Sequence, residues 1–436
     1  MANSVSKASR VAVAYLSCAL LLACTNSAAA AEALSLPGET MGTTYVVKIA
    51  DPPANLDADA LHKSIDAALE TVNDQMSTWR PDSELSRFNA ADTTDWVSVS
   101  PALVTVIAES QRISAATDGA FDVTVGPLIS LWGFDHEGRP EKTPTAAEIA
   151  AARARCGYRK LDVRADPPAL RKSRPDLSVN LSAIAKGYGV DVVADLLDEA
   201  GLKNYMVEIG GEVRTRGRNA ADKDWHIGVE APRAGLMHEI YRVVSPGERG
   251  MATSGDYRNF FEQDGKIYSH TIDPKTGRPI ESGLASATVL ADSCMTADAW
   301  ARAMMSRGPE RGMHTAAAQK LSVMLIAREA GGNFRELSNA GFGALVSDTP
   351  VPAEATSPLT LFLIALSVFA LALIGMSVGV IVSNRRIKGS CGGLNNMTDD
   401  EGRSICDICT TPPEECDRVR AAVAEGAGRV ADAGEK

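Results

Sequence analysis

The chain has 436 residues, 45% hydrophobic and 23% charged, and this ordinary globular composition excludes a disordered or collagen-like protein. Its 44 Lys and Arg stand against 55 Asp and Glu, a formal net charge of −11, which argues against a nucleic acid partner because that ligand needs a basic surface. Eight cysteines are too few for a disulfide scaffold, but four of them follow residue 390. The end of the chain is therefore expected to form a module with its own chemistry.

The chain begins with the features of an export signal, predicted over residues 1–31. Two basic residues precede the apolar run Val11–Ala23, which is too short to span a bilayer comfortably. The tetrapeptide Leu-Leu-Ala-Cys that ends at Cys24 resembles a lipobox, in which this cysteine would be lipidated. Cleavage within Ala28–Ala31 is the alternative, and both readings predict that the following region is exported.

A second membrane signal lies near the end of the chain. Residues Leu359–Val382 carry no charge and are long enough for one transmembrane helix at about 1.5 Å per residue. A polar, Pro-containing linker is expected over 347–358, and three basic residues follow the span: Arg385, Arg386 and Lys388. Because positive flanks stay in the cytoplasm, this pattern predicts an inner-membrane protein with residues 33–346 outside and the tail inside. A buried core helix is the alternative.

Residues 33–346 mix helical and strand-like patterns irregularly. Helices are predicted at Leu56–Met76, Ser100–Ala116, Thr145–Ala154, Lys186–Ala200 and Thr296–Ser306. Strands are predicted at Thr44–Ile49, Tyr205–Ile209, Trp225–Glu230, Ala287–Leu290 and Ser322–Ala327. The mixture indicates a single large α+β domain with a mixed or mostly antiparallel sheet. The alternation is too irregular for a doubly wound sheet, and there is no GxGxxG or Walker loop.

The segments between these elements carry the chemistry. Seven motifs follow one another: Met41–Tyr45, Met76–Ser86, Asp118–Leu128, Asn180–Tyr188, Glu208–Glu212, Thr253–Arg258 and Ser269–Pro279. In this order and spacing they resemble the ApbE family of FAD:protein FMN transferases along almost the whole exported region. The resemblance implies that the FMN half of FAD is passed to a Thr or Ser hydroxyl of an acceptor protein, that AMP leaves, and that Mg²⁺ sits on the diphosphate. Phosphoryl transfer of this kind needs positioning, charge neutralisation and one base.

The resemblance also assigns roles to individual residues. His270 lies in a polar, turn-rich segment that suits a base near neutral pH, although a lone His is usually packed or exposed. With His270, Asp273 is assigned to catalysis. Flavin and adenine contacts are implied for Met41, Trp79, Ala120, Phe121, Asp122, Asn180, Lys186 and Ile272. Trp79 would offer a face for stacking, and Lys186 opens a helix where it could meet a phosphate; a core Trp and a solvated Lys are the alternatives.

The implied Mg²⁺ site contains one departure from the family pattern. The resemblance places it at Asp298, a backbone carbonyl near Ala183, and groups one helical turn beyond the aspartate, Ala301 and Arg302. Relatives usually have Thr where this chain has Arg302, and many have Asp at the position of Asn180. Arg302 could swing away, contact the diphosphate, or weaken the activity. A flavin-holding lipoprotein and an FAD pyrophosphatase therefore remain alternatives to a transferase.

The tail has a chemistry of its own. Its cysteines, in a cytoplasmic location, indicate metal thiolate ligation or redox chemistry: Cys391, Cys406, Cys409 and Cys416. The span, the basic flank and residues 383–417 resemble the NqrM family, which implies maturation of the Na⁺-translocating NADH:quinone reductase, possible iron handling, and that complex's threonine-bearing subunits as acceptors. Residues 418–436 are expected to be disordered. An assembly protein that depends only on this tail is the third alternative.

Overall fold

The computed structural model describes residues 33–135, 142–232, 239–256, 260–263, 266–329 and 333–347, with five positions between 362 and 369. The chain divides into two units, Met1–Val351 and Pro352–Lys436, and nearly all described residues belong to the first. None of the helices among the described residues combines the length and hydrophobicity that a membrane crossing requires. The predicted export signal, the cysteine tail and almost all of the predicted span lie outside the described residues.

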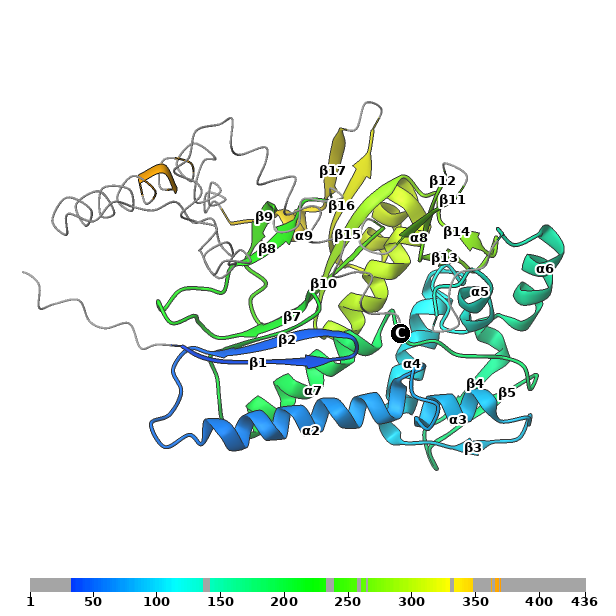
Figure 1. Ribbon diagram of the computed structural model, residues 1–436, viewed down its shortest axis with the longest axis horizontal. Helices are drawn as coiled ribbons and strands as arrows, with labels where there is room; N and C mark the ends of the chain where they lie inside the picture. Colours follow the sequence, from blue (N-terminus) through cyan, green and yellow to red (C-terminus); the bar gives the residue numbers. More distant parts are fainter. Residues whose placement is uncertain are drawn as a thin grey trace, which may run out of the picture. The chain divides into compact units, whose positions relative to one another are not determined.

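An eight-stranded sheet forms the centre of the first unit, in the order β1-β2-β6-β7-β10-β15-β16-β17 (Figure 1). All neighbouring strands in it run antiparallel. The strands are β1 Leu34–Thr40, β2 Thr43–Ile49, β6 Tyr205–Ile209, β7 Glu212–Arg216, β10 Gly250–Gly255, β15 Leu284–Ala291, β16 Ser322–Arg328 and β17 Phe334–Ser338. This sheet confirms the predicted α+β class and settles the choice between mixed and antiparallel pairing.

Two tight hairpins in this sheet explain two of the sequence motifs. The β1–β2 turn places Met41 at φ 50° and Gly42 at φ 72°, and the β6–β7 turn places Gly210 at φ 56° and Gly211 at φ 97°. Two-residue hairpins with positive φ at both positions match the right-handed twist of the paired strands, and glycine adopts that backbone at little cost. The motifs Met41–Tyr45 and Glu208–Glu212 thus encode turns.

Helices α7 and α8 lie together against the sheet, with α8 packed on β10 and β15 (Figure 1). The two helices approach closely at Gly187, where an added Cβ would lie 2.4 Å from the carbonyl oxygen of Cys294. The helices are α2 Ala58–Met76, α3 Glu84–Ala90, α4 Pro101–Ala116, α5 Gly126–Leu131, α6 Ala146–Arg155, α7 Ala185–Glu199, α8 Cys294–Ala318 and α9 Ala340–Gly343, with a 3₁₀ turn at Tyr158–Lys160. The small residue at position 187 therefore determines how near α7 comes to the start of α8.

Four smaller sheets complete the described part of this unit. They pair β3-β5-β4, β8-β9, β11-β12 and β13-β14. Their strands are β3 Val97–Ser98, β4 Leu161–Arg164, β5 Ala169–Lys172, β8 Ile227–Glu230, β9 Ile240–Val244, β11 Phe260–Gln263, β12 Lys266–Ser269, β13 Ile272–Asp273 and β14 Arg278–Pro279. The short β13–β14 ribbon follows His270 directly, so the last sequence motif is also a turn between strands.

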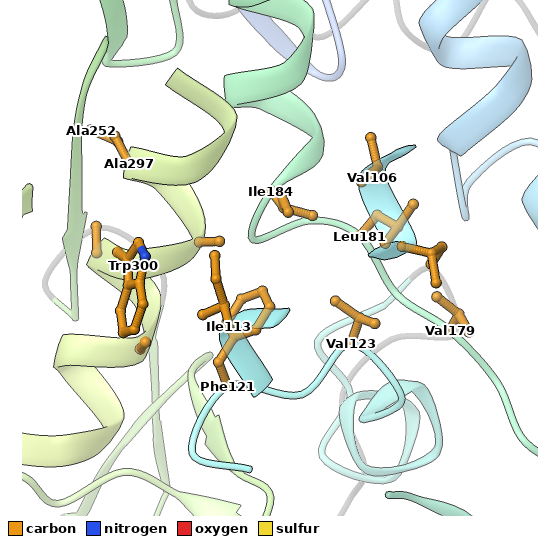
Figure 2. Packing of buried hydrophobic residues seen from close by; sticks show 14 of the residues in the cluster. Val106, Ile113, Phe121, Val123, Val179, Leu181, Ile184, Ala252, Ala297 and Trp300 are labelled. Atoms are coloured by element: carbon orange, nitrogen blue, oxygen red, sulfur yellow. The ribbon is translucent and has the colours of Figure 1, made fainter. Parts of the chain in front are cut away.

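The largest apolar cluster holds three distant segments in place. Phe121 and Val123 come from the loop after α4, Leu181 and Ile184 from the segment before α7, and Trp300 from α8 (Figure 2). All five side chains are at most 2% exposed. Each large apolar side chain buried in this way contributes about 1.5–3 kcal/mol. The same segments continue directly into polar residues, so the core fixes the positions of those residues as well.

The predicted elements agree with the structure to within one or two residues at most ends. The largest difference is at α8, which is predicted to end at Ser306 and continues to Ala318, and β15 also begins three residues before its predicted start at Ala287. Helix α8 consists of two helical pieces that meet at Gly308, whose φ of 75° and ψ of −179° are not helical, and Pro309 follows. The apolar period breaks there because the chain kinks, so the sequence pattern marked the end of the first piece only. Cys156 and Cys294 are buried free thiols.

Candidate active site

A cavity with a largely apolar lining and a few polar side chains lies where the three segments held by the core meet. Its walls come from the loop after α4, the segment before α7, the stretch that leads into β13, and α8. Predicted site residues on these walls are Ala120, Phe121, Asp122, Asn180, Ala183, His270, Ile272 and Arg302. The walls also include Val123, Val125, Ile129, Ser182, Thr271, Pro274 and Ser306. Tertiary packing therefore collects three of the seven sequence motifs, together with part of α8, around one cavity.

Asp122 ties one wall of the cavity to the neighbouring loop. Its Oδ1 accepts hydrogen bonds from the backbone N–H of Thr124 at 2.8 Å and from the Thr124 hydroxyl at 2.6 Å. Its Oδ2 accepts the N–H of Tyr158 at 2.8 Å. Burial raises the pKa of Asp122, while these hydrogen bonds oppose the change. The Asp122 carboxylate therefore mainly holds its own loop against Tyr158, and any contact with a ligand would be additional.

His270 lies in the segment that leads into β13. It is half-buried on the cavity wall, and its ring meets that of Phe134 edge-on, with 6.4 Å between centroids. The next two residues, Thr271 and Ile272, are 3% and 6% exposed, so they anchor the segment. An imidazole on an anchored segment, in the wall of this cavity, is placed for proton transfer.

A cluster of four charges adjoins the cavity, and we call Lys186, Glu212, Asp298 and Arg302 the buried cluster because both of its acidic residues are only 3% exposed. The Lys186 Nζ donates to the Glu212 carboxylate, which links the start of α7 to β7. The Asp298 Oδ2, on α8, accepts the backbone N–H of Gly187 at 3.1 Å. The close packing of α7 on α8 thus brings two cations and two carboxylates together from three elements.

The pKa values in the buried cluster reflect burial and mutual charge. Burial raises the pKa of Glu212 to about 7, against the opposing effect of Lys186. Burial also raises the pKa of Asp298, opposed by Lys186, the Gly187 N–H and Arg302. For Lys186, burial acts to lower the pKa, but Glu212 and Asp298 outweigh it and the pKa is raised. Each charge in the cluster therefore depends on its neighbours.

Arg302 reaches the cavity rather than swinging away from it. Its Nη1 donates a hydrogen bond to the Thr271 hydroxyl, beside His270. Its Nε is buried and has no hydrogen-bond partner among the described residues. Burial lowers the pKa of the guanidinium, and Asp298 and Glu212 act in the opposite direction.

The residues at Asp298 suit a Mg²⁺ ion that is shared with a phosphate. The site offers one buried carboxylate, and the described residues hold no group of three or more His, Cys, Asp or Glu that could bind a metal. Mg²⁺ characteristically takes one or two carboxylates and completes its shell with substrate phosphates and water. Asp298 and the backbone carbonyl of Ala183 would hold the ion, and a hydroxyl ligand is missing because position 302 is occupied by Arg.

Six of the predicted site residues in the described part of the chain do not line the cavity: Lys186 and Asp298 belong to the buried cluster at its side, and four others lie elsewhere. The Met41 side chain packs on Gly189 of α7, and Trp79 is 67% exposed in the loop between α2 and α3. The Asp273 carboxylate accepts the Lys275 N–H at 2.9 Å within the β13–β14 turn. Ala301 is fully buried in α8. The roles predicted for these residues stay predictions, and the observed contacts of Asp273 are those of a turn residue.

Several residues of the site were not singled out from the sequence. Glu212 pairs with Lys186, and its only sequence signal is its place at the end of the motif Glu208–Glu212. Thr271 holds Arg302, and Ser182 and Ser306 line the cavity. Hydroxyl side chains in loops are too common to stand out before the fold places them.

Comparisons with known proteins agree on this fold. The solved structure of Flavin Transferase ApbE from Vibrio cholerae superposes with a TM-score of 0.67 at 47% identity, over 72% of this chain and 99% of that one. The flavinyl transferase ApbE of Pseudomonas stutzeri gives 0.66 at 38% identity, over 72% and 96%. The α+β domain with this cavity is therefore the flavin transferase fold.

The sequence comparisons specify the family. The FAD:protein FMN transferase of Vibrio cholerae is 48% identical over 335 residues, 77% of this chain and 98% of that protein, and the one from Haemophilus influenzae is 44% identical, over 70% and 90%. The ApbE family profile matches residues 41–325, and the chain belongs to this family. A second profile, (Na+)-NQR maturation NqrM, matches residues 380–428, so both resemblances expected from the sequence are confirmed.

Proposed function

We propose that the protein is a membrane-bound FAD:protein FMN transferase. The main support for this proposal is a single cavity that is lined by His270 and by the loops predicted to bind flavin, with the buried cluster at its side. The hydroxyl oxygen of an acceptor Thr or Ser attacks the phosphorus of the FMN half and forms a phosphoester. The bond to the bridging oxygen breaks, AMP leaves, and His270 takes the hydroxyl proton.

The other residues of the cavity position the substrate. Phe121, Asn180 and Ile272 lie on the wall where the flavin would bind, and Trp79 would stack on the adenine. Lys186, at the start of α7, and Arg302, on the cavity wall, bring positive charge toward the diphosphate. Asp298 and the Ala183 carbonyl would hold Mg²⁺, which when bound neutralises charge on the transferring phosphoryl group.

The decisive experiment incubates the full chain with FAD, Mg²⁺ and a threonine-motif acceptor domain of the Na⁺-translocating NADH:quinone reductase, followed by intact mass spectrometry of the acceptor. A gain of one FMN group supports the transferase. Free FMN and AMP with an unmodified acceptor would indicate a pyrophosphatase, and intact bound FAD a flavin-holding protein. His270→Ala should retain FAD and lose about 10²- to 10⁴-fold of the transfer rate.

We further propose that the two profiles describe two maturation steps for one complex. The span Leu359–Val382 would anchor the protein in the inner membrane, together with the predicted signal, whether or not Cys24 is lipidated. The transferase domain would then lie on the outer side of this membrane, and the cysteine tail, with any iron that it binds, on the cytoplasmic side. Deletion of residues 383–436 should leave acceptor flavinylation intact while impairing the quinone reductase. Loss of flavinylation in this deletion would instead favour a function that depends on the tail.

A further inference from the structure

A guanidinium on a cavity wall is the least explained feature of the site. Arg302 lies on the wall beside His270 and Asn180, and its Nη1 is held by Thr271. The Nε is buried and lacks a partner among the residues that the structure describes. A buried donor without an acceptor destabilises the site, and more so when the donor is charged. A ligand that supplied an acceptor at this position would remove this destabilisation.

The charges around Arg302 show which ligand fits. With all four groups ionised, the two cations and two carboxylates of the buried cluster balance, so the cluster itself does not need an added cation. A dinucleotide diphosphate brings two negative charges. The planar guanidinium has five N–H donors, which suit phosphate oxygens, and Thr271 accepts a hydrogen bond from only one of them.

We propose that Arg302 binds the diphosphate of the dinucleotide and supplies part of the positive charge there, so that the protein holds FAD with a reduced requirement for Mg²⁺. This inference rests on the proposed function and deepens it. Thr271 fixes one edge of the guanidinium, and Arg302 lines the cavity, so its other donors would be available to phosphate oxygens. Replacement by a neutral residue would leave the cluster with an excess negative charge, which repels a diphosphate unless a divalent ion compensates.

The test measures FAD binding without catalysis, by quenching of flavin fluorescence with the full chain in EDTA and in Mg²⁺. Arg302→Thr should weaken FAD binding about 10- to 100-fold in EDTA and clearly less in Mg²⁺. Riboflavin, which has no phosphate, should bind both proteins equally. Arg302→Lys should recover part of the loss. Arg311→Thr, which removes an exposed cation from the same helix, should behave as the wild type.

Different failures have different meanings. Equal FAD binding by wild type and Arg302→Thr in EDTA would overturn this inference and leave the proposed function standing. Equal weakening of FAD and riboflavin binding would have the same meaning, because it would indicate a packing role for Arg302. A wild type that binds no FAD in either condition would overturn the proposed function as well. If the Thr variant does not unfold cooperatively in urea, Arg302→Met, a neutral side chain of similar length, takes its place.

Discussion

Two groups of charges in this protein have similar ion-pair distances and very different surroundings. In the exposed trio, Arg80 lies 2.6 Å from Glu70 and 2.7 Å from Asp74, and the three side chains are 36%, 57% and 66% exposed. In the buried cluster, Lys186 pairs with Glu212, whose side chain is only 5% exposed, and Asp298 is 3% exposed.

The difference shows that burial, and not the number of ion pairs, decides what a charge does. Water screens the exposed trio, so its net contribution to stability is expected to be small. In the buried cluster the two carboxylates have lost nearly all contact with water, although the Lys186 side chain is still 29% exposed, and removal of a cation would leave a buried carboxylate without compensation. The trio therefore serves as a reference against which the buried cluster can be tested.

The largest expected effect is on stability. Lys186→Met removes the cation that compensates Glu212 and Asp298, and should lower the free energy of unfolding by about 3–5 kcal/mol. Arg80→Met, the matched change in the exposed trio, should cost less than about 1 kcal/mol. Urea denaturation of both variants measures the two values. Equal losses of unfolding free energy in the two variants would show that burial does not make the buried cluster different from the exposed trio.

The next prediction concerns pH. Glu212 faces Lys186 on α7 and Asp298 and Arg302 on α8, and its pKa is raised to about 7 from 4.5. The native state thus keeps a proton that the unfolded chain releases, so this stabilisation is present below about pH 4.5 and is lost as the pH rises through about 7. Relative to Glu212→Gln, wild-type unfolding free energy should fall by about 3 kcal/mol over this window. Urea denaturation at several pH values measures it, and parallel profiles would contradict the prediction.

A smaller effect is expected from the helix contact that assembles the buried cluster. Gly187→Ala would place a Cβ 2.4 Å from the Cys294 carbonyl oxygen and push α7 from α8, with a cost of about 1–3 kcal/mol. Gly343→Ala is the control, because nothing lies within 4 Å of a Cβ there, and its effect should stay within about 0.5 kcal/mol. Thermal unfolding compares them. A neutral Gly187→Ala would mean that the helices can separate without strain.

The smallest effect belongs to the neighbour of the exposed trio. Trp79→Ala should leave stability unchanged, because the side chain is 67% exposed, but should weaken FAD binding by about 1 kcal/mol if the ring stacks on adenine. FAD and FMN titrations separate the possibilities, since FMN has no adenine. Equal weakening for both ligands would remove the stacking role.

The sequence by itself determined the elements, the class of fold and the family. Apolar periodicity and turn residues are local signals, so α2, α4 and β6 could be predicted nearly to the residue. The glycine pairs and polar motifs marked the loops, and their order carried the resemblance to flavin transferases. The place of Arg302, one helical turn after Asp298, was also evident, because helix geometry places such residues on one face.

Only the tertiary structure decided which side chains meet. Lys186 and Glu212 are 26 residues apart, and Arg302 and Thr271 are 31 apart. Their pairing depends on the antiparallel register of the sheet and on the packing of α7 against α8, which no local pattern specifies. The same packing brought Arg302 into the cavity, a choice that the sequence left open. Which polar side chains pair depends on the whole fold, because burial of apolar residues selects the fold and the buried polar groups must be paired within it.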